Sequence, residues 1–455
     1  MNTYTKSGGG GAGSGQPGRQ KLAQGENPGN QCGAKSAEPR QGRHNANRSA
    51  LAGRAPAHLG IYIQVPFCQT KCTYCNFHTG VASPAAYAPY ARAVEREIRE
   101  WRALHAAAGL ESAARLHSCL PDTIYLGGGT PSLFDPADLA RILGAVRSQF
   151  GAGRTRAGGT HTEVTLEADP ETITPEKAAA WLAAGINRVS LGAQSFHDAE
   201  LKSAGRMHRR ADIFSAVAHL RAAGVGNISL DLIAGLPHQT AASWCESLEQ
   251  ALGLPPEHIS IYLFEIDEGS RLGRELLSGG ARYSAAAVPS DDAMAESYEF
   301  ACERLARAGY EHYEISNWAL PGFRSRHNLK YWRREAYLGF GAGAHSFDGR
   351  SRWANAHDPA AYGAAIEQGR LPIEQLEEIT PRQALDEELF LGLRQLEGID
   401  LASIAAQYGS QFTDDLGARI EELHAQGLVE REGTRLRLAP ARLAVSNEVF
   451  VALLD

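Results

Sequence analysis

"IYIQVPFCQTKCTYCNF" spans residues 61–77 and joins an apolar, β-branched run to three closely spaced cysteines. The run at 61–65 has the composition of a strand, and the thiols of Cys68, Cys72 and Cys75 follow it directly. Side chains at the carboxyl ends of parallel strands lie on the face where α/β proteins carry their chemistry. The stretch therefore predicts the first strand of the fold and the position of its functional site.

The chain repeats this alternation of strand and helix. Short runs rich in β-branched and apolar residues recur, and segments with helical apolar spacing separate them. Such alternation predicts an α/β fold with a parallel sheet and covering helices. The expected strands are 61–65, 123–126, 163–168, 187–191, 228–233 and 258–263, and the expected helices are 84–101, 136–150, 174–185, 210–224 and 241–253.

The composition favours a globular protein without a membrane span. The chain has 455 residues, of which 43% are hydrophobic, enough for one large domain and one or two smaller pieces. No stretch stays apolar for the roughly eighteen residues that cross a bilayer, and no secretory-signal core lies near the first residues. We therefore expect a cytoplasmic protein whose cysteines are reduced thiols.

Residues 1–56 have a different composition from the rest of the chain. They are rich in Gly, Ser, Gln, Asn and Pro, and predict a disordered tail. Eight Lys or Arg residues stand against Glu26 and Glu38, so the tail could contact an anionic membrane surface peripherally, although a solvated extension is the simpler interpretation. Glycine runs oppose the amphipathic helix that a transit peptide needs.

Residues 376–455 predict a separate small unit. Helical patterns at 386–396 and 412–427 precede a probable β-hairpin at 428–440, which is typical of a winged-helix-like domain. The charge balance of this unit is acidic, so it does not indicate nucleic-acid binding.

The three cysteines admit two kinds of metal site. A structural zinc site needs four protein ligands, and His78 would complete a Cys₃His set. A [4Fe–4S] cluster is usually held by four thiolates. If only three are supplied, one iron keeps an open coordination position for a substrate or cofactor.

The spacing C-x-x-x-C-x-x-C, with Tyr74 before the last cysteine, resembles the signature loop of radical S-adenosylmethionine enzymes. In that family the loop follows the first strand of a partial (β/α)₆ barrel and holds a [4Fe–4S] cluster. The open iron chelates S-adenosylmethionine, and an electron from the cluster cleaves it to methionine and a 5′-deoxyadenosyl radical. The resemblance therefore implies a cluster on Cys68, Cys72 and Cys75, S-adenosylmethionine as second cofactor, and an electron donor.

Other residues match further cofactor contacts of that family. "YLGGGTPS" (125–132) places Gly127 to Thr130 after the second expected strand, where bare backbone N–H groups can approach a ligand. The alternative is a tight turn that needs glycine for geometry alone. Capping, ion pairing and core packing are the alternatives for the other residues. The implied S-adenosylmethionine contacts are Tyr62, Tyr74, Gly128, Gly129, Thr130, Glu167, Gln194, Arg206 and Asp231.

From about residue 60 to its end, the chain is similar to the family of oxygen-independent coproporphyrinogen III oxidase and its relatives. The stretches that carry the likeness are "NRVSLGAQSF", "LDLIAGLP", "YEISNWALPGFRSRHNLKYW" and "YLGFGAGAHS". The resemblance implies a radical S-adenosylmethionine barrel core at 57–290, an extension at 291–375 and the winged-helix-like domain at 376–455. The true oxidase has a fourth cysteine where this chain has Phe77, and an ordered N-terminal arm.

A second branch of this family consists of haem chaperones, whose hallmark H-N-x-x-Y-W is matched by "HNLKYW" (327–332). His327 can present an imidazole to haem iron, while Tyr331 and Trp332 offer flat surface to a porphyrin. The alternative is a packed histidine beside core aromatics. Because the motif lies beyond the six expected strands, His327 should act independently of the cluster thiolates.

Two functions follow from the resemblance. The favoured one is a haem chaperone that binds haem and transfers it to acceptors such as respiratory enzymes, using the cluster and S-adenosylmethionine. The alternative is an oxidase that removes carbon dioxide from the propionate side chains of coproporphyrinogen III. Phe77 and "HNLKYW" favour the first function. The sequence assigns no catalytic residue, and whether the chain is an enzyme stays open.

Overall fold

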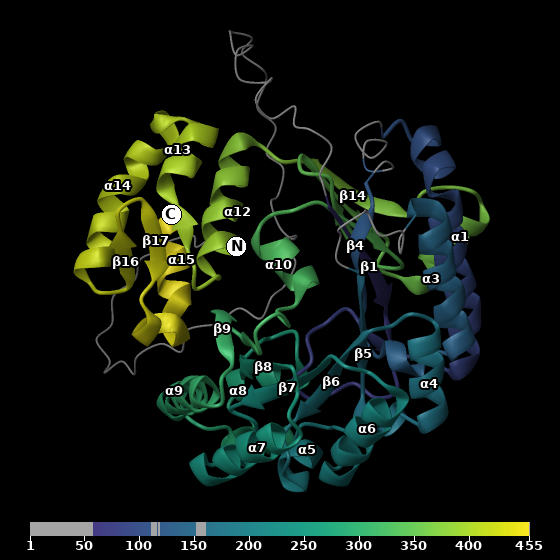
Figure 1. Ribbon diagram of the computed structural model, residues 1–455, viewed down its shortest axis with the longest axis horizontal. Coiled ribbons are helices and arrows are strands. Elements are labelled where there is room, and N and C mark those ends of the chain that lie inside the picture. Colours follow the sequence, from purple (N-terminus) through teal and green to yellow (C-terminus); the bar gives the residue numbers. More distant parts are fainter. Residues whose placement is uncertain (1–57, 111–115, 117–118, 152–160, 455) are drawn as a thin grey trace.

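The computed structural model describes residues 58–110, 116, 119–151 and 161–454 (Figure 1). The predicted disordered tail at 1–56 lies outside the described residues. Among the helices that are described, none has the length and apolar character that a membrane span needs.

The centre of the molecule is a run of parallel strands that confirms the predicted α/β class. All six expected strands are present and pair side by side in chain order. They are β1 (Leu59–Val65), β4 (Pro121–Gly128), β5 (Glu163–Ala168), β6 (Arg188–Gln194), β7 (Ile228–Ala234) and β8 (His258–Leu263).

Helices between the strands cover the outer face of this sheet (Figure 1). Some of these helices begin with a capping side chain; for example, the Asp135 side chain accepts a hydrogen bond from the Ala137 N–H at the start of α3, with Pro136 at the first helical position. The apolar strand residues Ile61 and Ile63 are fully buried in the core on this side. The helices are α1 (Tyr87–Ala107), α3 (Pro136–Phe150), α4 (Pro175–Ala183), α6 (Arg210–Ala223), α7 (Ala241–Gly253) and α9 (Asp291–Arg307).

The other face of the parallel strands is polar. Tyr62 pairs in register with Tyr125, Glu167 with Ser190, and Asp231 with Ser260. Side chains alternate between faces along a strand, so polar positions between buried aliphatic ones gather on the face away from the helices. This polar interior positions the candidate site.

Residues 291–375 extend the same sheet at both edges, which the sequence did not predict. On one side β11 pairs parallel to β1, and β12, β13 and β14 follow antiparallel; on the other side β10 and β9 continue antiparallel from β8. The predicted boundary at 290/291 stays a prediction. The added strands are β9 (Glu311–Glu314), β10 (Asn317–Ala319), β11 (Tyr337–Phe340), β12 (His345–Phe347), β13 (Ser351–Asn355) and β14 (Ile373–Glu378).

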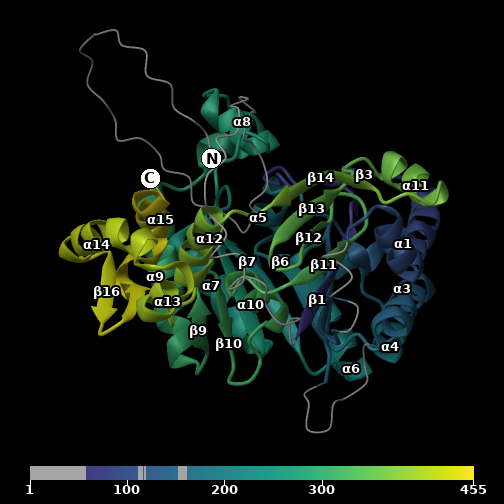
Figure 2. The ribbon, with the colours of Figure 1, turned by 90° about the horizontal axis from the view of Figure 1, so that it is seen from above.

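The C-terminal unit has the expected helices and hairpin. It lies beside β9 and β10, on the side of the barrel opposite to α1 and α3 (Figures 1 and 2). Gly433, with φ of 60°, makes the hairpin turn. The elements are α12 (Pro381–Leu393), β15 (Ile399–Asp400), α13 (Leu401–Tyr408), α14 (Ser410–Ala425), β16 (Val429–Glu432), β17 (Arg435–Leu438) and α15 (Ser446–Leu454).

Candidate functional site

The three cysteines lie in a loop that follows β1. The loop begins with β2 (Phe67–Cys68), which pairs parallel to β3 (Gly80–Val81), and the Cys75 N–H donates to the Cys72 carbonyl at 3.3 Å. Burial raises the pKa of Cys75, and the neighbouring Cys72 adds to this rise. Among the described residues, no three metal-ligating side chains are already gathered around one point. The thiols are close enough to interact and would draw together on binding a cluster.

The zinc alternative depends on His78. The centroid of its imidazole ring lies 4.6 Å from that of His357, which comes from a distant part of the sequence. The three thiols of the loop fit a [4Fe–4S] cluster with an open iron, which stays a proposal.

Arg206 places a positive charge beside the cysteine loop. One guanidinium nitrogen lies 3.6 Å from the Cys72 sulfur, and another donates to the Gly192 carbonyl at 3.0 Å and to Asp169. Although burial opposes the charged form, Asp169 helps to hold the pKa of Arg206 well above its usual range. A fixed cation at this position stabilises thiolate sulfur, which a cluster requires.

The glycine turn after β4 packs directly against the cysteine loop. A Cβ atom on Gly129 would lie 2.4 Å from the Phe67 carbonyl oxygen and 3.0 Å from the Cys68 sulfur. The Gly129 N–H donates to the Val65 carbonyl at 2.7 Å, and the Thr130 N–H donates to the Phe67 carbonyl at 2.8 Å. These N–H groups therefore already have partners, which favours the tight-turn interpretation; their role as S-adenosylmethionine contacts stays a prediction.

Glu167 is the central carboxylate of the polar interior. It accepts hydrogen bonds from the Tyr125 hydroxyl at 2.8 Å and the Gly128 N–H at 2.9 Å. Burial raises its pKa to about 7, although both hydrogen bonds oppose this rise. A carboxyl group that titrates near neutral pH can hold a proton or pair with a bound ammonium group, such as that of an amino acid.

Four more residues that were predicted to contact S-adenosylmethionine are Gln194, Tyr74, Tyr62 and Asp231. Gln194 ends β6 with φ of 63°, a left-handed conformation that is strained for a residue other than glycine. Tyr74 packs against a small apolar cluster next to the loop. Deeper in the interior, Tyr62 stacks on Tyr125 at 6.0 Å, and Asp231 accepts from the Ser190 hydroxyl at 3.1 Å. Their roles toward a cofactor stay predictions.

His327 lies away from the cysteine loop, near the start of β4. It belongs to α10 (Arg326–Trp332) and is 1% exposed. One ring nitrogen lies 2.9 Å from the Thr123 hydroxyl and the other 3.0 Å from the Tyr331 hydroxyl. In this conformation neither nitrogen is open to iron, so the structure has the packed histidine of the alternative interpretation.

The aromatic side chains of the motif also point inward. Tyr331 uses its hydroxyl on His327 and packs edge-on against Tyr337 at 4.8 Å. The guanidinium of Arg394 lies 4.5 Å from the ring of Trp332 and covers one face. A porphyrin could contact these predicted flat surfaces only after α10 or its neighbours move.

The buried imidazole of His327 predicts a specific acid sensitivity. Burial, with the charges of Lys330 and Arg188, lowers its pKa to about 3, whereas an unfolded histidine titrates near 6.5. Below pH 6.5 the unfolded chain therefore binds more protons, and the stabilising contribution is lost as pH falls toward 3. We expect the free energy of unfolding to fall between pH 7 and pH 5, and to fall by about 2 kcal/mol less in His327→Gln than in the unmodified protein. Chemical unfolding at the two pH values measures this difference.

The comparison of these two proteins cancels the other titrating groups, because His312 and His345, whose pKa burial lowers to about 4, are present in both. Equal losses of unfolding free energy in the two proteins would contradict the assigned buried, neutral state of His327.

Three residues of the site were not predicted from the sequence. Asp169 anchors Arg206, Tyr125 bonds Glu167, and Thr123 bonds His327. Each lies two residues from another site residue along a strand or just after its end. Side chains two apart on a strand share a face, so this spacing was the sequence signal that could have identified them.

Family models match both parts of the chain. The model described as "Radical SAM superfamily" matches residues 62–251, and the one described as "HemN C-terminal domain" matches residues 379–441. These matches cover the parallel strands from β1 to β7 with the cysteine loop, and most of the C-terminal unit.

Curated relatives match over nearly their whole length. The chain is 32% identical to "Heme chaperone HemW" of Bacillus subtilis, covering 86% of this chain and 98% of that protein. It is 34% identical to the protein of the same name from Mycobacterium tuberculosis, covering 89% and 97%. Among solved structures, coproporphyrinogen III oxidase (HemN) from Escherichia coli is similar, with a TM-score of 0.73 over 89% of this chain and 92% of that chain. At 22% identity, that last likeness concerns the fold.

Proposed function

We propose, on the premise that the chain belongs to the family of the heme chaperone HemW, that it binds haem and transfers it to haem-requiring proteins. The observation that carries this proposal is the likeness to the curated heme chaperones of Bacillus subtilis and Mycobacterium tuberculosis over 98% and 97% of their lengths. Phe77, at the position of the oxidase's extra cysteine, supports this branch over decarboxylation of coproporphyrinogen III.

Cys68, Cys72 and Cys75 would hold a [4Fe–4S] cluster in this proposal, and its open iron would receive S-adenosylmethionine. When bound and reduced by a donor protein, the cluster would supply an electron to that ligand. Arg206, which is also paired with Asp169, would face the Cys72 thiolate from 3.6 Å, and Glu167 would offer a carboxyl group to the cofactor's ammonium group. Acceptors such as respiratory enzymes, a cytoplasmic location and peripheral membrane contact belong to the same proposal.

His327 is the proposed axial ligand of haem iron, with one structural requirement. Iron needs a free ring nitrogen, and the nitrogen facing Tyr331 is held only by a hydroxyl contact of 3.0 Å. A single neutral hydrogen bond contributes about 1 kcal/mol, so this bond is a small part of the cost, and the movement of α10 or its neighbours that exposes the buried ring is the larger part. Binding of haem should therefore accompany separation of His327 from Tyr331.

Titration of haem into the anaerobically reconstituted protein, followed by its Soret band, tests the function. We expect retained haem with the unmodified chain, weaker binding with His327→Ala because the axial imidazole is lost, and undiminished binding with Tyr331→Phe because only the competing hydrogen bond is removed. Cys68→Ala should still bind haem, since His327 lies near the start of β4 and the cysteine loop follows the end of β1.

A parallel incubation with coproporphyrinogen III tests the alternative. Formation of protoporphyrinogen would contradict the chaperone function, and absence of a Soret shift with the unmodified chain would do the same. If His327→Ala binds haem as tightly as the unmodified protein, the function stands and the axial ligand is another residue.

A further inference from the structure

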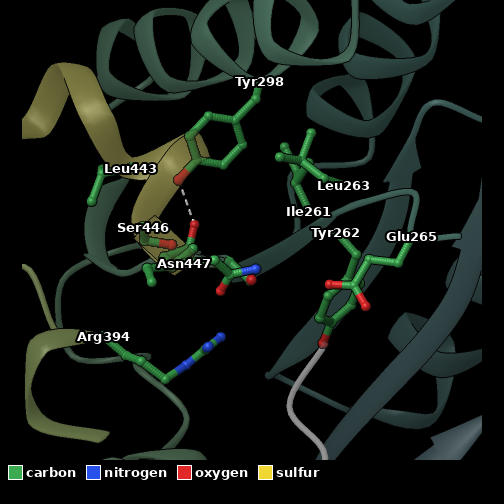
Figure 3. Close-up of a pocket in the computed structure, with 11 residues that line it drawn as sticks. Ile261, Tyr262, Leu263, Glu265, Tyr298, Arg394, Leu443, Ser446 and Asn447 are labelled. Atoms are coloured by element: carbon green, nitrogen blue, oxygen red, sulfur yellow. Dashed lines mark hydrogen bonds between the residues drawn. The ribbon is translucent and has the colours of Figure 1, made fainter. Parts of the chain in front are cut away.

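A pocket lies between the last parallel strand of the barrel and the C-terminal unit (Figure 3). It comprises about 420 Å³ of space, including its open mouth. One wall comes from Ile261 and Leu263 on β8, and the opposite wall from Ser446, the first residue of α15, and Leu443 in the short 3-10 helix before it. Neither unit forms the pocket alone.

Arg394 lines this pocket with a buried positive charge. It follows the last residue of α12, and its carbonyl accepts a hydrogen bond from the Ile315 N–H at 3.1 Å, which fixes its backbone. The residue is 4% exposed, and Figure 3 shows its guanidinium directed toward the pocket. A cation held at this depth is normally paired.

No hydrogen bond or ion pair joins this guanidinium to any residue that the structure describes. Its Nε atom is buried without a partner, and its contact with the Trp332 ring at 4.5 Å engages a face of the group, not its N–H donors. Arg304 on α9, by contrast, has two hydrogen bonds to Glu249. The fork of N–H donors on Arg394 is therefore available to a ligand.

Glu314 interacts electrostatically with Arg394, but no hydrogen bond joins its carboxyl group to the N–H groups of the guanidinium. Burial raises the pKa of Glu314, and the charge of Arg394 opposes this rise. Its carboxyl group accepts from the Asn317 amide, and its other oxygen has no partner among the described residues. The Arg394 guanidinium thus faces a space whose walls are partly aliphatic and partly polar, and the carboxylate of Glu265 lines the same pocket.

We propose that this pocket binds a carboxylate through Arg394 and that the carboxylate is a propionate arm of haem. Arginine matches carboxylates with two parallel hydrogen bonds, and the wall of Ile261, Leu263 and Leu443 suits the methylene groups of the arm. The contact between Arg394 and Trp332 joins the pocket to the HNLKYW helix. The identity of the ligand rests on the proposed haem function.

Haem and its dimethyl ester, which lacks both carboxylates, provide the test. The unmodified, cluster-loaded chain should bind haem roughly ten- to a hundredfold tighter than the ester. This is the affinity ratio expected from one hydrogen-bonded pair of opposite charges. Arg394→Gln should bind both compounds with the affinity of the ester, and Arg394→Lys should show an intermediate preference. Arg307→Gln, an exposed change on α9, should behave like the unmodified chain.

The outcomes separate the two proposals. Equal binding of haem and ester by the unmodified chain overturns the carboxylate site without any variant, while the haem function stands. An unchanged preference for haem in Arg394→Gln also overturns it. Binding of neither compound to the unmodified chain overturns the proposed function and, with it, the identity of the ligand.

Discussion

Cys72→Ala should yield a folded protein without an iron–sulfur cluster. Anaerobic reconstitution of the unmodified chain should give about four iron and four sulfide per chain, and the variant should retain essentially none. Removal of one of only three thiolates leaves two ligands, and Cys72 is also the thiol nearest to Arg206, at 3.6 Å. Iron and sulfide analysis with the visible absorption spectrum measures this loss.

Cys245→Ala is the matched control, because this thiol lies on α7, outside the loop, and no other described cysteine is near it in sequence. It should keep full cluster content. Stoichiometric zinc in the unmodified chain, lost on His78→Ala, would contradict the cluster and favour the Cys₃His site. Cluster retention by Cys72→Ala would show that another residue supplies a ligand.

Gly129→Ala should impair the same site without replacing any of the three thiols, because the added methyl crowds the loop that holds them. The added methyl would lie 2.4 Å from the Phe67 carbonyl oxygen, a backbone atom that cannot turn aside, so the cysteine loop or the β4 turn must shift. Overpacking of this kind costs about 1–3 kcal/mol. We expect lower thermal stability, reduced cluster content, and an EPR spectrum of the reduced cluster that no longer responds to S-adenosylmethionine.

Gly144→Ala on α3 is the control, since no atom lies within 4 Å of its added methyl. It should be neutral or gain about 0.5–1 kcal/mol, because alanine is the better helix former. Normal cluster content and an unchanged response to S-adenosylmethionine in Gly129→Ala would contradict the close approach of turn and loop. Gly128 is a less direct test: its φ of 110° strains any side chain, although the atoms it would meet belong to the flexible Gln64 side chain.

The six parallel strands and their helices could be predicted because each has a local signal. Apolar β-branched runs such as 228–233 are long enough to show their composition, and caps such as Asp135 mark helix starts. The added strands β10 and β12, each of three residues, carry no such signal. They are too short to show a strand composition, and they form because β10 pairs with the distant strand β8 and β12 pairs with its neighbours β11 and β13.

The candidate site likewise has features that could be predicted from the sequence and features that could not. The cysteine spacing and the HNLKYW hallmark are contiguous and could be identified, and with them the family. These motifs did not determine the role of the glycine turn or the state of His327. The glycine turn has its N–H groups bonded to the cysteine loop, and His327 is buried against Thr123 and Tyr331.

By itself the sequence determined the α/β class, the order of the barrel strands and the position of three thiols after the first of them. These properties depend on residues adjacent along the chain, whose spacing sets strand, helix and ligand geometry. Only the tertiary structure decided that Arg206 lies beside Cys72, that both nitrogens of His327 are engaged, and that Arg394 faces a pocket without a hydrogen-bond partner among the described residues. Burial and pairing of a polar group depend on what distant segments bring to it, and side-chain spacing along one segment does not contain that information.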